Sequence, residues 1–94
     1  MNNEEAIQVL ERELSSFRDE PYADLVLRMP AGSLEFERSA ASGAKYQVEI
    51  HFLWDDRPGG DIRVMGSIDD GGWRACIPLC RSFIKSANGS FVGE

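Results

Sequence analysis

One histidine and two cysteines are the side chains of this chain best suited to nucleophilic or metal chemistry. The histidine is His51, and the thiols are Cys76 and Cys80. A nucleophilic thiol needs a base within hydrogen-bond reach, and a structural zinc ion needs about four nitrogen or sulfur ligands around it. The strands that carry these three residues decide whether they can meet.

Residues 45–80 are predicted to form three antiparallel strands. From Tyr46 to Trp54 apolar residues alternate with polar ones, which is the pattern of a strand with one buried face. Asp70-Gly71 is typical of a two-residue hairpin turn, because such turns need positive φ. That turn predicts four pairs on the apolar face: Ile68 with Trp73, Gly66 with Ala75, Val64 with Ile77, and Ile62 with Leu79.

The connection before the middle strand leaves two registers open. A five-residue loop over 56–60 sets Trp54 opposite Ile62 and Ile50 opposite Gly66, whereas a three-residue loop over 58–60 shifts the pairing. We expect the small residues Gly66 and Ala75 to leave a dip in the sheet that a helix side chain fills.

The predicted register separates the reactive side chains. His51 faces Met65, and Cys76 lies one strand further, so histidine and thiol are roughly 9.5 Å apart at ~4.8 Å per strand. Cys76 and Cys80 share a face but lie roughly 13 Å apart at ~3.3 Å per residue, which is too far for a disulfide. We therefore predict free thiols, no catalytic residue, no metal site and no cofactor.

The acidic pairs of the chain resemble a carboxylate cluster only on paper. Asp55-Asp56 and Asp69-Asp70 flank the middle strand, which spans roughly 20–25 Å. Aspartate favours such turn positions because its side chain bonds the local backbone. We interpret both pairs as turn residues.

The rest of the chain supplies a helix and further strands. Apolar residues recur at helical spacing over 4–18, Asn2 or Asn3 can cap the helix, and Pro21 ends it. Residues 23–29 suit either a strand or a helical turn. Residues 34–38 alternate as a strand, 39–44 form a surface loop, and Asn88-Gly89 indicates a small terminal hairpin.

These elements predict an α+β fold. An amphipathic N-terminal helix, about 4–18, is packed on one face of a four- to six-stranded antiparallel meander sheet that covers about 24–92. With 94 residues and 43% hydrophobic composition, we expect residues 1–94 to form one domain.

Charge and hydropathy narrow the function classes. The net charge is −6, which argues against nucleic-acid binding, since that needs a basic surface. No apolar run approaches the ~20 residues needed to span a bilayer, and the acidic N-terminus lacks the basic start of a secretory signal. We expect a cytoplasmic protein without a membrane or nucleic-acid partner.

Two surfaces are candidates for binding a protein partner. Residues 1–24 contain seven acidic and two basic residues, so the helix offers an acidic surface suited to a basic partner, although a solvated helix face would look the same. The sheet face away from the helix mixes apolar and polar residues, as interfaces do. The candidates on the helix are Glu4, Glu11 and Glu13, and those on the sheet face are His51, Leu53, Arg63, Met65, Arg74 and Cys76.

The absence of catalytic motifs from the sequence and the uneven charge favour a non-catalytic protein-interaction module. An inhibitor or immunity-type protein is the kind we expect, with self-association through the sheet as a further hypothesis. The alternative is a small-ligand-binding protein or enzyme with a cleft between helix and sheet, near Trp54 and Tyr46.

Overall fold

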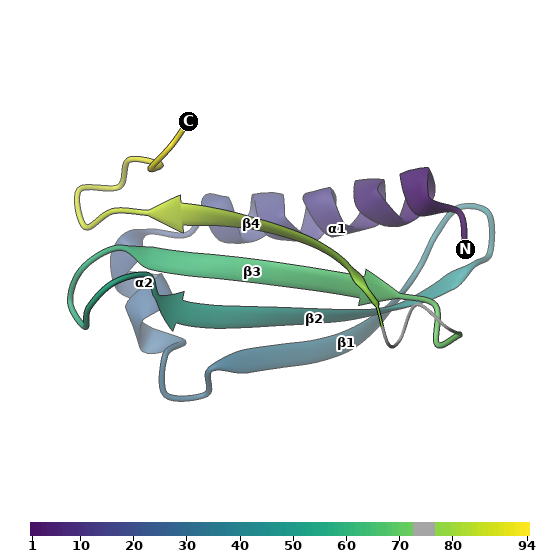
Figure 1. Cartoon of the computed structure of the whole chain (residues 1–94), viewed down its shortest axis with the longest axis horizontal. Coiled ribbons are helices and arrows are strands. Elements are labelled where there is room, and N and C mark those ends of the chain that lie inside the picture. Colours follow the sequence, from purple (N-terminus) through teal and green to yellow (C-terminus); the bar gives the residue numbers. More distant parts are fainter. Residues whose placement is uncertain (73–76) are drawn as a thin grey trace.

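The computed structural model describes residues 1–72 and 77–94. Its elements are α1 (Asn3–Arg18), α2 (Tyr22–Leu27), β1 (Ser33–Ser39), β2 (Lys45–Trp54), β3 (Ile62–Asp69) and β4 (Leu79–Lys85). The strands form one antiparallel sheet in the order β1-β2-β3-β4, and α1 lies along the β3 and β4 side of it (Figure 1). The predicted α+β architecture is therefore confirmed, with four strands in the sheet.

Helix α1 forms where its periodicity predicts it. The side chain of Asn2 accepts a hydrogen bond from the backbone N–H of Glu5, which satisfies one of the free donors of the first turn. The residues that face the sheet are buried: Ala6, Leu10, Leu14 and Phe17. Neither helix in the described part of the chain is long and apolar enough to cross a membrane.

The ambiguous segment 23–29 is helical as far as Leu27 and continues as a turn, so the sheet begins at Ser33 and not near residue 24. Pro21 sits at the N-cap of α2, where its fixed φ suits a helix start, and Leu25 is buried in the core. Arg28 follows the helix and makes a bidentate pair with Glu20, at 2.9 and 2.8 Å. This hydrogen-bonded pairing raises the pKa of Arg28.

The five-residue connection between β2 and β3 is confirmed. Trp54 pairs with Ile62, Phe52 with Val64, and Ile50 with Gly66. The loop closes at the next pair, where the Asp55 N–H donates to the Asp61 carbonyl at 2.8 Å. Side chains on the inner face of both strands are consequently buried together under α1.

The predicted register between β3 and the following strand is wrong. Ile68 pairs with Leu79, and Ile62 pairs with Lys85 rather than with Leu79, because the strand runs over 79–85 instead of 73–79. Asp69, the last residue of β3, and Asp70 after it each accept a hydrogen bond from the backbone N–H two residues ahead, as turn-forming aspartates do. The predicted partners Trp73 and Ala75 lie outside the described residues.

The loop between β1 and β2 and the loop after β4 are each closed by backbone hydrogen bonds. Ser39 belongs to β1, and the turn after it is closed by Ala40 donating to Ala44 at 2.8 Å. At the C-terminus Lys85 bridges to Phe91 around Gly89, whose φ is +87°. The predicted terminal hairpin is therefore present as a short bridge next to β4.

Candidate interaction surfaces

His51 lies on the outer face of the sheet, the face turned away from α1. It is opposite Met65, as predicted, and its Nε2 contacts a carboxylate oxygen of Glu49 on the same strand. The imidazole thus lies beside this carboxylate and the Met65 thioether, and Ser33 of β1 is directly opposite it on the other side. Among the described residues no hydrogen bond joins the Ser33 hydroxyl to this imidazole, so the arrangement is a histidine–carboxylate contact without a bound nucleophile.

Cys80 is placed differently from the prediction. Cys80 lies on β4 opposite Ser67, in the row of Glu49, and is exposed and free. Its strand is two spacings from β2, roughly 9.6 Å at ~4.8 Å each, and its row is next to that of His51. Cys76 lies outside the described residues. Among residues 1–72 and 77–94 no three His, Cys, Asp or Glu side chains converge as a metal site would require.

Two adjacent rows of the outer face form what we term the outer patch. The first row is Leu53, Arg63 and Ile84, and the second is His51, Met65 and Ser82. Leu53 is 43% exposed, and Met65 and Ile84 are half-buried although they face away from the core. No helix in the described part of the chain lies on this face, since the buried residues of α1 and α2 belong to the core on the other side.

Polar contacts hold the outer patch in a defined shape. The Arg63 side chain on β3 donates to Asp55, the residue after β2, at 3.0 Å and to Ser82 of β4 at 3.3 Å. Of the six predicted face residues, His51, Leu53, Arg63 and Met65 come together here. Arg74 lies outside the described residues, as does Cys76, and Ile84 and Ser82 take the places on β4 that the wrong register had assigned to other residues.

An acidic corner, which the sequence reasoning missed, borders the outer patch. Its members are Glu35, Glu37, Gln47, Glu49 and Asp69. Glu35 is directly opposite Glu49, and a shallow hollow of about 170 Å³ lies among Glu35, Gln47, Glu49 and Asp69. The alternation over 34–38 was visible in the sequence, but its pairing with 45–51 was not, so these acids could not be placed side by side.

The acidic surface of α1 is partly neutralised by arginines of the sheet. Glu13 accepts a hydrogen bond from the Arg38 guanidinium at 2.6 Å, and Glu11 lies 3.5 Å from that of Arg81. Glu4 is exposed. The three predicted helix residues therefore do not form a uniform negative stripe. Their long-range attraction to a basic protein is weaker than the sequence suggests.

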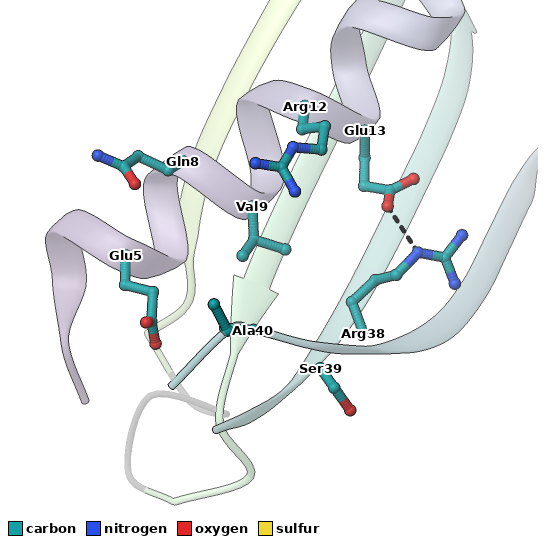
Figure 2. Close-up of a pocket in the computed structure, with 9 residues that line it drawn as sticks. Glu5, Gln8, Val9, Arg12, Glu13, Arg38, Ser39 and Ala40 are labelled. Atoms are coloured by element: carbon teal, nitrogen blue, oxygen red, sulfur yellow. Dashed lines mark hydrogen bonds and ion pairs between the residues drawn. The ribbon is translucent and has the colours of Figure 1, made fainter. Parts of the chain in front are cut away.

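A groove of about 170 Å³ runs between α1 and the end of β1, lined among others by Val9, Arg12, Arg38 and Ala40. Figure 2 shows Val9 pointing from the helix into this groove, while Glu13 and Arg38 meet across it. The Arg38 guanidinium also lies over the Phe36 ring, 4.2 Å from its centroid. Arginine thus covers part of the apolar surface of β1.

The two aromatic residues of the predicted cleft lie far apart. Tyr46 and Trp54 stand at opposite ends of β2, separated by eight residues or roughly 26 Å at ~3.3 Å each. Tyr46 is 1% exposed, and its hydroxyl donates to Glu5 at 2.7 Å. Burial and this hydrogen bond raise the pKa of Tyr46 to about 12. The pair cannot line one small-molecule cleft.

Comparison of the chain with protein-family models, with curated proteins and with solved structures found no match in any of the three.

Proposed function

We propose that this protein is a non-catalytic interaction module that binds a protein partner through the outer patch. The observation that carries the proposal is the exposure of Leu53, together with half-buried Met65 and Ile84, on a sheet face that no described helix covers. Interfaces combine an apolar centre with a polar rim, and the outer patch has this composition.

Charge indicates the chemistry of the partner. The acidic corner lies next to the outer patch, on the same face, and the whole chain carries a net charge of −6. A partner with an apolar centre and a basic rim would place its lysines and arginines over these carboxylates, which raises the association rate and fixes the orientation. A surface of this kind suits an inhibitor or immunity-type protein that binds over a basic partner.

The polar side chains around the patch support binding rather than catalysis. Arg63 is held by Asp55 and Ser82, and His51 is paired with Glu49. A catalytic set would in addition join a nucleophile to its base by a hydrogen bond, next to a place for the reacting atom. The contacts of Arg63 and His51 in the described part of the chain join no nucleophile to a base.

Two charge variants test which surface binds. Wild-type protein, Leu53→Glu and the double variant Glu4→Gln/Glu11→Gln are each immobilised. Each is then used to capture partners from a lysate, at low and at high salt. Leu53 and the two glutamates are exposed, so these changes should leave folding intact.

We expect wild-type protein and the helix variant to capture one basic protein that Leu53→Glu does not capture. High salt should weaken its binding. The purified captured protein must then bind directly. A partner lost only with the helix variant would instead assign the function to α1, and self-association abolished by Leu53→Glu would make the outer patch a dimer interface.

A further inference from the structure

Strand β1 is an edge of the sheet, and its hydrogen bonds to β2 alternate. Phe52 donates to Gly32, and Ala40 donates to Ala44, so the bonded pairs on this side include Leu34 with Ile50 and Phe36 with Val48. The residues between them turn their backbone groups away from β2. These outward residues are Ser33, Glu35, Glu37 and Ser39.

The outward backbone groups of β1 have no strand partner in the described part of the chain. The sheet order ends at β1, and the one hydrogen bond that another described residue makes to these outward groups is from the Arg38 guanidinium to the Glu37 carbonyl, at 3.2 Å. A carbonyl has two acceptor positions, so a second donor can still bind there. An added strand would therefore find the N–H and C=O of Glu35 and the N–H of Glu37 available.

Charge selects the occupant of this edge. A residue directly opposite Glu35 or Glu37 in an added strand points to the same face as that carboxylate, with the acidic corner behind it. Lysine or arginine at those positions would be attracted. A second copy of β1, paired antiparallel about Phe36 or either neighbour, would instead set glutamate against glutamate, which is unfavourable.

The other face of an added strand would have apolar surroundings. Leu34 and Phe36 of β1 are half-buried and point to the inner face, and the groove with Val9 and Ala40 begins at the end of the same strand. Small apolar side chains that alternate with the basic ones would pack there, and Arg38 would move aside or stack on the new strand (Figure 2).

We propose that the outward edge of β1 binds an extended segment in which basic and apolar residues alternate, as an added antiparallel strand. The basic residues lie over Glu35 and Glu37, and the backbone supplies the remaining contacts. This inference goes beyond the outer patch, because it concerns the backbone edge of β1, which shares only the acidic corner with the proposed interface, and a ligand that is an extended segment rather than a folded face.

Matched peptides test the backbone pairing. The probe is a capped eight-residue peptide of alternating lysine and valine, titrated into isotopically labelled full-length protein at low salt. In the proposed register the lysines direct their N–H toward β1 and the valines direct theirs away. A peptide with N-methyl-lysine at the central positions should bind at least about tenfold more weakly, whereas one with N-methyl-valine should bind like the parent.

Matched variants of β1 test the same point from the protein side. Glu37→Pro and Glu37→Thr both lose the carboxylate, but only proline loses the outward N–H, which β2 does not use. We expect Glu37→Thr to weaken binding several-fold and Glu37→Pro to weaken it well beyond that.

The largest amide shifts on titration should be those of Glu35 and Glu37. Absence of saturable binding would overturn the proposal, and so would binding that is indifferent to N-methyl-lysine, since that would be charge attraction alone. If Glu37→Pro does not fold, the two N-methylated peptides still decide. The outer patch is unaffected by either result, because its test uses Leu53.

Discussion

Leu10 of α1 occupies the space that a β-carbon at Gly66 of β3 would need. Such a carbon would lie 2.7 Å from Leu10 Cδ1, and also 3.2 Å from Ile50 Cδ1 and 3.3 Å from Leu14 Cδ2. Leu10 and Ile50 are fully buried. The helix is thus seated on the sheet at a glycine, on the face opposite the outer patch.

Gly66→Ala should therefore destabilise the protein by about 1–3 kcal/mol, because the added methyl overfills a packed core. Urea unfolding with an unchanged m-value measures the loss. In the double variant Leu10→Ala/Gly66→Ala the new methyl gains room, so the two losses should be less than additive. Strict additivity would show that α1 is not seated on Gly66.

Lys85 should contribute more stability than an ordinary surface lysine. Its side chain is buried, and its Nζ donates to the carbonyls of Arg18 and Glu20 at 2.8 and 2.7 Å, next to the end of α1. Lys85→Met leaves both carbonyls without this donor and should cost about 2–3 kcal/mol. The exposed Lys45→Met is the control, and an equal effect of both substitutions would contradict this role.

Stability should fall at alkaline pH because of Tyr46. Its pKa is raised by burial and by the hydrogen bond to Glu5, from 10.0 to about 12. In this window the unfolded chain releases the phenolic proton and the folded protein keeps it, so stability is complete below pH ~10 and is lost toward pH 12.

Tyr46→Phe is the matched control for this pH dependence. The difference in unfolding free energy between wild type and Tyr46→Phe, measured from pH 9 to 11.5, should change steadily in favour of the variant above pH ~10. A constant difference over this range would mean that another group sets the alkaline limit. Ultraviolet titration of the phenols gives the independent check.

The sequence was sufficient where local signals agreed with one another. The apolar periodicity of 4–18 with an asparagine cap gave α1, and the alternation on both sides of the 56–60 loop gave the β2–β3 register. Gly66 was also expected to receive a helix side chain, and Leu10 is that residue.

The sequence was insufficient where a turn signal competed with long-range packing. Asp70-Gly71 predicted a tight hairpin, but in the structure Ile68 pairs with Leu79. With this pairing β4 ends at Lys85, whose side chain donates a hydrogen bond to the last residue of α1. The pattern of residues 23–29 fitted either a strand or a helical turn. The helix is the form in which Leu25 is buried in the core, and that depends on tertiary packing. The acidic corner depends on the β1–β2 pairing, for which no turn motif was present.

The captured and purified partner is titrated into wild-type protein, Leu53→Glu and Glu4→Gln/Glu11→Gln. This measurement of affinity tests the proposed function most directly. The account predicts that Leu53→Glu weakens the affinity at least about tenfold relative to wild type, or about 1.4 kcal/mol, because a charge is placed at the apolar centre of the outer patch. Glu4→Gln/Glu11→Gln should stay within about twofold of wild type. Unchanged affinity with Leu53→Glu, or a loss confined to the helix variant, would contradict it.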